Sequence, residues 1–262
     1  MKRLCNIFLF SCILCTSSPA AMAAGEPVAG YEQLLQQARQ LLSTYKDSEA
    51  LQLYEQVLSV APDNYEALCK ASFLHCRIGD RYTDETSKTN HFSKAKLFAQ
   101  QAYALNPEDA ESNYVMAMAT ACEAMIAGPR QRLIDINEVK TFVDAALARD
   151  SRHAGAWHIM GRWYYKMANL NMAEKIASKM LFGGVCGEAT NQEAAKALEN
   201  AVAYDPGNIR YYFDLACVYA EMKDAAACTA TLEKAISLQY ETKEELELSR
   251  RCKIMLQEQQ KL

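Results

Sequence analysis

Long apolar runs are almost absent from this sequence. The run from Leu4 to Leu14 has roughly a dozen residues, whereas a helix that spans a bilayer takes about 20. Lys2 and Arg3 precede it, and the small-residue pattern Ala21-Met22-Ala23 follows it. Because this order is typical of a secretory signal peptide, we expect cleavage near Ala23/Ala24 and export to the periplasm or cell envelope. No later segment reaches about 18 consecutive apolar residues, so we expect no transmembrane segment in the mature chain.

A lipid anchor on Cys12 is the alternative at this end of the chain. Lipidation needs small residues before the cysteine, and here Phe10 stands two positions before it. A soluble mature protein and an envelope-associated one both stay open.

Blocks of basic residues are absent as well. The formal net charge is −4, and removal of the two positive residues of the signal peptide moves it to about −6. Domains that bind nucleic acid carry a basic patch or stripe. The mildly acidic balance therefore argues against nucleic acid as a partner.

Paired cysteine motifs are also lacking. Of the ten cysteines, three lie in the signal peptide, and no C-x-x-C pair occurs among the rest. An odd number of scattered cysteines is neither a disulfide framework nor a zinc ribbon, so we expect mostly small buried apolar residues, with one or two bridges still open. The seven cysteines of the mature chain are Cys69, Cys76, Cys122, Cys186, Cys217, Cys228 and Cys252.

Catalytic motifs are missing too. The chain has no G-x-S-x-G, H-E-x-x-H, Walker loop or dinucleotide fingerprint. The glycine-rich stretch 183–187 follows a predicted helix rather than a strand, so we interpret it as a helix terminator and turn. We therefore expect no enzyme, no cofactor and no metal site. Since no alternating strand pattern or hairpin dipeptide occurs either, the sequence predicts an all-α fold.

What the sequence does contain is an internal repeat. The segments 61–64, 106–109 and 205–208 share one pattern, Ala61-Pro62-Asp63-Asn64 being the first. In each, a helix ends, proline prevents its continuation, and an Asp or Asn can cap the next helix. Small or apolar residues five, eight and twelve positions before each proline are typical of the second helix of a tetratricopeptide repeat.

The first helix of the repeat has its own signature, W-x2-L-G-x2-Y. The stretch from Trp157 to Tyr164 satisfies it, with Met160 for Leu, and Gly161 lets the two helices of a pair approach closely. Repeats in this register begin near Tyr31, Tyr65, Ala110, Ala154 and Ile209. Spacings of 34, 45, 44 and 55 residues indicate insertions in three of them.

The three insertions differ in character. The first, 79–92, is polar, and we expect a surface loop there. The second, 127–136, contains Gly128-Pro129, which breaks the helix. The third, 167–189, predicts a short extra amphipathic helix, which either covers one edge of the fourth repeat or forms a second docking surface. Its apolar residues are Leu170, Ile176, Met180, Leu181 and Phe182.

Two capping boxes mark later helix starts. Thr190 with Glu193 begins the second helix of the fourth repeat, and Thr242 with Glu245 begins a last helix that runs to about Gln259. This polar last helix suits a cap over the exposed end of the array. The sequence therefore predicts a signal peptide at 1–23, a linker at 24–30, and a right-handed α-α superhelix of about five tetratricopeptide-like helix pairs at 31–262.

The stretch from Ala154 to Asp224 resembles the regulator of microtubule dynamics family. The resemblance is strong over about a quarter of the chain and weaker over about three quarters. It implies a divergent tetratricopeptide-like domain and an adaptor-like role, and it carries over no catalytic residue. Because an exported chain does not meet tubulin, we expect a bacterial envelope member without the microtubule activity. The residues that carry the resemblance are Gly161-Arg162-Trp163-Tyr164, Ala168-Asn169-Leu170, Lys175-Ile176-Ala177, Leu181-Phe182-Gly183 and Glu193-Ala194-Ala195 before Asp205-Pro206.

The repeat register also predicts a binding groove. In such repeats, positions 2, 5, 9, 12 and 13 of each first helix line the concave face. Aromatic rings beside Arg and Lys suit an extended peptide or a carboxylate. The predicted groove residues are Phe73, Arg77, Tyr114, Met118, His158, Arg162, Tyr165, Lys166, Arg210 and Phe213, with Glu66, Glu111 and Glu221 at further groove positions.

The same register places several cysteines on the groove side. A sharper hypothesis is that Cys69, Cys76 and Cys122, with His158 nearby, form a metal or redox site. Cys69 and Cys76 lie seven residues apart on one helix, which separates them by about 10 Å, too far for a disulfide. A bridge between Cys76 and Cys122 stays open, and ordinary buried thiols are the expectation. His75 is expected to be a packed core histidine.

Together these observations favour an exported, non-catalytic scaffold or adaptor that binds a protein or peptide in its concave groove. The alternative is a carrier of a small ligand or lipid, in which the 167–189 insertion closes an apolar pocket beside Leu181 and Phe182. An open groove would favour the scaffold and a deep pocket the carrier. The oligomeric state is left open.

Overall fold

The computed structural model describes residues 27–182 and 189–260, and within these ranges every regular element is a helix. The signal peptide predicted at 1–23 lies outside them, as does the stretch 183–188 with its predicted turn and Cys186. The helices are α1 (Pro27–Ser43), α2 (Asp47–Val60), α3 (Tyr65–Arg81), α4 (Glu85–Leu105), α5 (Ala110–Ile126), α6 (Pro129–Arg149), α7 (Ala154–Ala168), α8 (Met172–Phe182), α9 (Asn191–Tyr204), α10 (Ile209–Glu221), α11 (Ala225–Ile236) and α12 (Lys243–Gln259).

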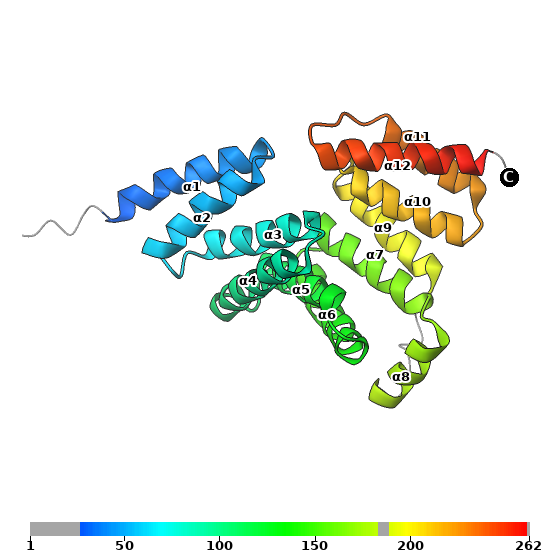
Figure 1. Ribbon diagram of the computed structural model, residues 1–262, viewed down its shortest axis with the longest axis horizontal. Helices are drawn as coiled ribbons and strands as arrows, with labels where there is room; N and C mark the ends of the chain where they lie inside the picture. The colour runs from blue at the N-terminus through cyan, green and yellow to red at the C-terminus, as the bar shows by residue number, and fades with distance from the viewer. Residues whose placement is uncertain (1–26, 183–188, 261–262) are drawn as a thin grey trace, which may run out of the picture.

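The helices form five pairs, and each pair packs on the next. The pairs are α1/α2, α3/α4, α5/α6, α7/α9 and α10/α11, and α12 packs on the last of them. Figure 1 shows them stacked into a curved superhelix, with α8 projecting at one edge. The predicted all-α repeat fold is confirmed, and the first helices of the last four pairs begin at the predicted Tyr65, Ala110, Ala154 and Ile209. The helix α1 begins at Pro27, inside the segment 24–30 assigned to a linker.

The predicted caps form at the helix starts. Asn64 accepts a hydrogen bond from the backbone N–H of Ala67, with 2.9 Å between the two atoms, and Asp109 and Asn208 cap α5 and α10 in the same way. Thr242 and Glu245 make a complete capping box at the start of α12. Each cap satisfies backbone donors that the helix itself leaves without a partner. The local turn chemistry therefore sets the repeat boundaries.

Small residues allow the paired helices to pack closely. A Cβ atom added to Gly161 of α7 would lie 2.5 Å from Cγ of Leu198 in α9, so only glycine fits this contact. Leu198 is buried between two alanines of its own helix, Ala194 and Ala201, which are likewise buried. The glycine of the predicted signature thus has the close-packing role expected of it.

The first insertion is not the surface loop that its composition predicted. The helix α3 continues to Arg81 and α4 begins at Glu85, so most of 79–92 is helical. Two local features explain this. Asp84 accepts a hydrogen bond from the backbone N–H of Ser87 at 2.7 Å and starts α4, and Phe92 is fully buried against Gly79. The buried Phe92 ring therefore anchors the polar first two turns of α4, and Ala95, Ala99 and Ala102 continue its buried face.

The second insertion lengthens a helix. Gly128 and Pro129 do break the chain, as expected, but Pro129 then occupies the first turn of α6, where its missing N–H costs nothing. Leu133 and Val139 are buried beyond it, so the residues of the insertion become part of a helix of 21 residues.

The third insertion forms the predicted extra helix, α8. Leu170 is buried, and Leu181 packs against the cluster that α6 and α7 share, so the insertion lies against the junction of the third and fourth pairs. Met172, Ile176 and Met180 are 74%, 56% and 84% exposed and form an apolar stripe on α8, which lies at the lower edge of the molecule in Figure 1. Among the described residues, no helix is both long and apolar enough to cross a membrane.

Candidate functional site

The first helices of successive pairs are joined to one another by polar contacts. Lys70 Nζ of α3 lies 2.7 Å from Glu111 Oε1 of α5, and His153, which caps α7, lies 3.3 Å from the other oxygen of Glu111. Further along, His158 Nε2 of α7 lies 2.7 Å from Asp214 Oδ2 of α10. These contacts orient the side chains of α3, α5, α7 and α10 toward one side of the superhelix, here termed the inner face.

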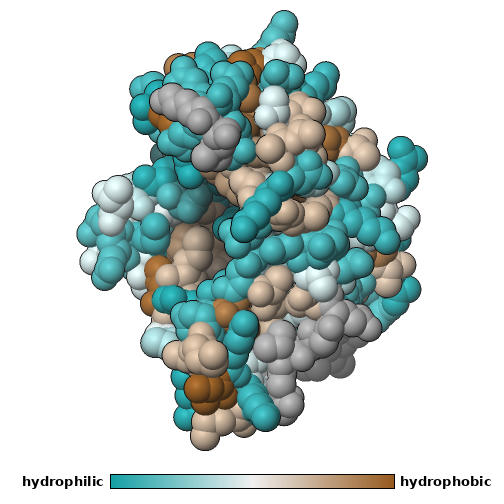
Figure 2. Space-filling view, turned by 90° about the vertical axis from the view of Figure 1, so that its right-hand side faces the viewer, coloured by the Kyte–Doolittle hydropathy of each residue, from teal (hydrophilic) through white to brown (hydrophobic). Residues whose placement is uncertain are grey.

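The two ends of the array also meet across this inner face. Arg81 Nε, at the end of α3, lies 2.8 Å from Glu244 Oε1 at the start of α12, and Figure 1 shows these two helix ends side by side. Arg210 of α10 lies 4.0 Å from Asp80 of α3. The inner face is therefore bounded by helices from the second, fourth and fifth pairs and by α12. In Figure 2 the molecule is hollowed near its centre, with some apolar surface at the floor and hydrophilic residues around it.

A half-buried acid, Asp214, and a buried histidine, His158, lie together on the inner face. His158 is 8% exposed, and its ring lies 4.6 Å from that of Tyr211. Burial lowers the pKa of His158, although the hydrogen bond with Asp214 opposes this. Burial alone would raise the pKa of Asp214, but the hydrogen bond from His158 and the charges of His158, Arg162 and Arg210 lower it overall. At neutral pH the pair is therefore a neutral imidazole that donates to a carboxylate.

Arginine side chains surround this pair beside aromatic rings. Arg162 Nε lies 3.9 Å from the Asp214 oxygen that His158 already contacts, and the Arg162 side chain is 57% exposed. Arg251 of α12 has its guanidinium carbon 4.3 Å from the centre of the Phe213 ring. On α3, Arg77 lies over Phe73 at 5.3 Å. Arg251 has no acid partner within the described residues, so its donors remain available for a ligand, whereas Arg77 also pairs with Asp47 at 3.1 Å.

The predicted groove residues do not all have the same surroundings. Arg162 and Arg210 are exposed, whereas His158 is buried. Lys166 Nζ lies 2.7 Å from Glu174 Oε1, so this lysine holds α8 and is not free for a partner in the groove. The half-buried members are Phe73, Arg77, Tyr114, Met118, Tyr165, Lys166 and Phe213.

Of the acidic groove positions, two are already occupied by neighbouring repeats. Glu66 accepts from Arg39 of α1, with 2.6 Å between Arg39 Nε and Glu66 Oε1, and Glu111 accepts from Lys70. Glu221 is exposed at the end of α10.

Three residues of the inner face were not found from the sequence. Asp214 stands outside the five groove positions of the repeat, and Arg251 belongs to the helix interpreted only as a cap. Asp47, at the start of α2, is 2% exposed and pairs with both Arg77 and Arg81. A buried acid at a helix start is a signal that could have been noticed, because acidic residues in first turns are usually solvated.

The cysteines carry no metal site among the residues that the structure describes. No group of three or more His, Cys, Asp or Glu side chains there is arranged to hold an ion. Six cysteines are free thiols, five of them buried and Cys217 half-buried. A hydrogen bond with Cys122 and burial raise the pKa of the Cys76 thiol well above its usual value. Cys76 and Cys122 are therefore direct neighbours across α3 and α5, and Cys76 is held as a neutral thiol.

His75 is the buried histidine that the sequence predicted. It is 1% exposed, and it contacts His91 of α4 and Glu55 of α2. Burial lowers the pKa of His75 to about 4, against the raising effect of Glu55.

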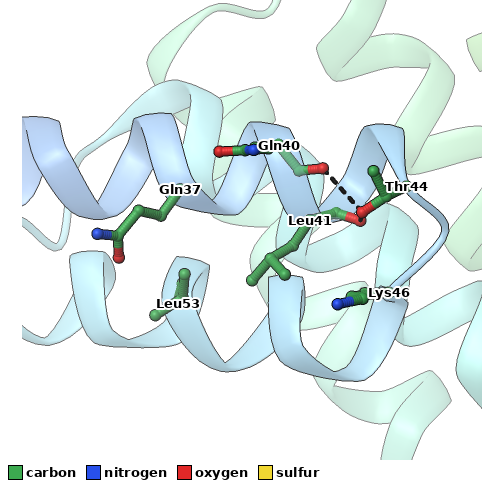
Figure 3. Close-up of a pocket in the computed structure, with 6 residues that line it drawn as sticks. All are labelled: Gln37, Gln40, Leu41, Thr44, Lys46 and Leu53. Carbon is green, nitrogen blue, oxygen red and sulfur yellow. Dashed lines mark hydrogen bonds between the residues drawn. The ribbon is translucent and has the colours of Figure 1, made fainter.

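A shallow pocket of about 430 Å³ lies between α1 and α2, away from the predicted groove (Figure 3). Leu41 and Leu53 supply its apolar wall, and Gln37, Gln40, Thr44 and Lys46 supply polar groups. In Figure 3 the Thr44 hydroxyl donates to the backbone oxygen of Gln40, at 3.0 Å. This pocket differs in place and in lining from the apolar cavity beside Leu181 that a carrier would need.

Comparisons with known proteins agree with this architecture. The family described as Regulator of microtubule dynamics protein 1-3 matches residues 34–260. TTC0263, a thermophilic TPR protein of Thermus thermophilus, superposes with a TM-score of 0.63 at 18% identity, over 87% of this chain and 99% of that chain. No curated protein matches this chain.

Two further solved structures are similar at lower scores. MamA 41-end from Desulfovibrio magneticus RS-1 has a TM-score of 0.47 at 15% identity, over 82% of this chain and 97% of that chain. YrrB, a TPR protein with an unusual peptide-binding site, has a TM-score of 0.42 at 15% identity, over 88% of this chain and 100% of that chain.

Proposed function

This chain belongs to the Regulator of microtubule dynamics protein 1-3 family, and we propose that it is a non-catalytic scaffold that binds an extended segment of a protein partner on its inner face. The observation that carries the proposal is the arrangement around Asp214. A partly buried hydrogen bond from His158 orients this carboxylate, and the exposed Arg162 lies 3.9 Å from the same oxygen.

Rings and cations alternate on this surface in a way that suits a peptide. Phe73 with Arg77 on one side and Phe213 with Arg251 on the other offer apolar contact area beside hydrogen-bond donors. A peptide in extended form places successive side chains on opposite sides, so it can contact rings and cations together. The half-buried Tyr165 adds an apolar body with a polar tip.

We further propose that the scaffold works in the periplasm or cell envelope. The support for this is the order of charged, apolar and small residues at 1–24. A fusion of the full chain to alkaline phosphatase, which is active only after export, is expected to be active. Loss of that activity on deletion of residues 2–23 is expected as well. An inactive fusion with the signal peptide intact would refute the location.

The binding surface is tested by capture from envelope extract. The protein without residues 1–23 is the bait, alone or with Arg162→Glu and Tyr165→Ala. Partners retained by the unchanged bait should be lost with the double variant.

The matched control carries Arg130→Glu and Tyr204→Ala, which remove the same two residue types from exposed positions of the second helices. It should keep the partners. If the Arg162/Tyr165 variant retained a partner undiminished, the assignment of the binding site to the inner face would be wrong.

A further inference from the structure

Three arginines converge on one turn of α10. They are Arg162 of α7, Arg210 of α10 and Arg251 of α12, and together they are termed the arginine cluster. Arg162 Nε lies 3.9 Å from Asp214 Oδ2, and the Arg251 guanidinium carbon lies 4.3 Å from the ring of Phe213, the residue before Asp214, while Arg210 lies one turn earlier on α10. Three helices from two repeats and the cap therefore bring their guanidinium groups to the same part of the inner face.

The arginine cluster lacks matching acids. Among the described residues the one acid within 4 Å of Arg162 is Asp214, at 3.9 Å, and His158 already contacts that carboxylate oxygen at 2.7 Å. Arg210 is 4.0 Å from Asp80. For Arg251, no ion pair occurs within the part of the chain that the structure describes, and its contact is the Phe213 ring. Among the described residues, these three positive groups thus have two carboxylates within 4.0 Å: Asp80, and Asp214, whose Oδ2 His158 already contacts.

Other arginines of the protein are engaged by acids at shorter distances. Arg39 holds Glu66 with two bonds, one of them 2.6 Å long, and Arg250, the neighbour of Arg251 in sequence, lies 2.8 Å from Glu247. Arg81 contacts two acids. Among the described residues Arg130 and Arg152 also lack an ion pair, but the arginine cluster is where three arginines from three helices come together, in a chain whose net charge is −4.

We propose that the arginine cluster anchors an acidic segment of the partner protein, with two or more carboxylates near one apolar side chain. Guanidinium groups bind carboxylates with two parallel hydrogen bonds, and the half-buried Phe213 ring beside Arg251 offers a surface for the apolar residue. This rests on the proposed scaffold function and names the chemical class of its partner.

The place of the cluster favours a peptide over other anions. It faces the enclosed side of the superhelix, where α12 meets α3, and a flat lipid surface does not reach such a position. A long polyanion such as nucleic acid would be repelled by the negative charge of the remaining chain. A short acidic segment meets the positive cluster without either obstacle.

The test uses fluorescence anisotropy with labelled peptides and the purified full chain. One probe is a peptide of nine residues in which Glu and Phe alternate and a single Gly separates each from the next. The matched probe has Gln in place of every Glu. The acidic probe is expected to bind at least about tenfold more tightly at low salt, and its affinity should fall as salt is raised.

Variants then assign that binding to the cluster. Arg162→Gln with Arg251→Gln should weaken the acidic probe about tenfold or more, and the corresponding lysine variant should retain part of the affinity. Arg130→Gln with Arg152→Gln, two exposed arginines elsewhere, should leave it unchanged. Unchanged far-ultraviolet circular dichroism verifies that each variant is folded.

Three results would overturn the inference: equal binding of the two probes, undiminished binding by the cluster variant, or stronger cluster-dependent binding to vesicles of anionic lipid. Loss of captured partners with the Arg162/Tyr165 bait but no affinity for acidic probes would refute the acidic partner alone. The proposed scaffold function would then stand.

Discussion

The Nδ1 atoms of His75 and His91 lie 2.9 Å apart, and the other ring nitrogen of His75 lies 3.2 Å from Glu55 Oε1. Because the carboxylate can only accept, His75 donates from Nε2, and its Nδ1 then accepts from His91. Lys94 Nζ also contacts Glu55, at 3.1 Å, while Phe98 stacks on the His75 ring. This directed chain of hydrogen bonds links α2, α3 and α4 and requires a neutral His75.

Acid should therefore destabilise the first two helix pairs. Burial lowers the pKa of His75 to about 4 and lowers the pKa of His91 as well, whereas both titrate near 6.5 in an unfolded chain. The unfolded chain thus binds more protons between these values, and stability present above pH 6.5 is lost as the pH falls toward 4. We expect a loss of the order of 2 kcal/mol in urea unfolding between pH 7 and pH 4.5.

Replacement of His75 should flatten this pH dependence. His75→Leu removes the buried titrating group, and its unfolding free energy should vary less over the same range. Phe98→Leu changes the packing on the same ring without removing a titrating group, so it should keep the original slope. Equal slopes for the two variants would contradict the role of His75.

The neighbouring thiols of Cys76 and Cys122 should be convertible to a disulfide. With diamide as oxidant, the two thiols lose two hydrogen atoms to the diazene, which becomes the hydrazine, and an S–S bond forms between α3 and α5. Since burial and the hydrogen bond with Cys122 keep the Cys76 thiol neutral, the reaction should be slow and should speed up at alkaline pH. Peptide mass spectrometry identifies the bridge.

The matched measurement follows Cys69, which lies on the same helix as Cys76 and is equally buried. It should remain unbridged in the folded protein under the same oxidant. If disulfides to Cys69 formed as fast as the disulfide between Cys76 and Cys122, oxidation would be taking place in the unfolded chain. It would then not depend on Cys76 and Cys122 being neighbours in the folded protein.

Gly161→Ala should destabilise the fourth helix pair. The added Cβ would lie 2.5 Å from Leu198 Cγ and 3.1 Å from the backbone oxygen of Ala194, and the backbone cannot yield as a flexible side chain does. A loss of about 1–3 kcal/mol is expected from such overpacking, measured by thermal or urea unfolding. Gly30→Ala in α1 meets no atom within 4 Å and should be neutral or slightly stabilising, because alanine favours a helix.

Asp47→Asn should weaken the junction between α2 and α3. Its buried carboxylate pairs with Arg77, at 3.1 Å, and with Arg81, so the amide would leave two guanidinium groups without their counter-charge. We expect a loss of about 1–3 kcal/mol in urea unfolding, reduced because both arginines are partly exposed. Glu49→Gln, on an exposed side chain of the same helix, should change stability little. A comparable loss of stability in both variants would show that the effect comes from the negative charge at the start of α2 and not from the ion pairs with Arg77 and Arg81.

The local features of this fold could be predicted, because they depend on neighbours in sequence. Turns such as Asp205-Pro206-Gly207-Asn208 located the helix starts, and Gly161 identified a close helix contact. The helical nature of 79–92 was missed because its polar composition resembles a loop, and one buried ring, Phe92, decides the outcome.

The candidate binding surface on the inner face was harder to predict from the sequence. The groove positions of a regular repeat include Arg162, yet the partners that orient it, Asp214 and His158, depend on how one pair of helices stacks on the next. Arg251 joins Phe213 only because α12 folds back over the last pair. Lys166 was predicted to line the groove, and its ammonium group forms an ion pair with Glu174 of the third insertion. Such contacts depend on the curvature of the superhelix, and the repeat pattern in the sequence does not predict that curvature.

Arg81 touches both the start of α2, through Asp47, and the start of α12, through Glu244. In an open repeat array each terminal unit touches a single neighbour, so the array frays from its ends. Here the guanidinium group of Arg81 connects α2 of the first pair with α12, the last helix. These contacts connect the stretch of chain between Asp47 and Glu244, so a force applied to the two ends should first peel away α1 and the C-terminal part of α12, and only then load the contacts of Arg81.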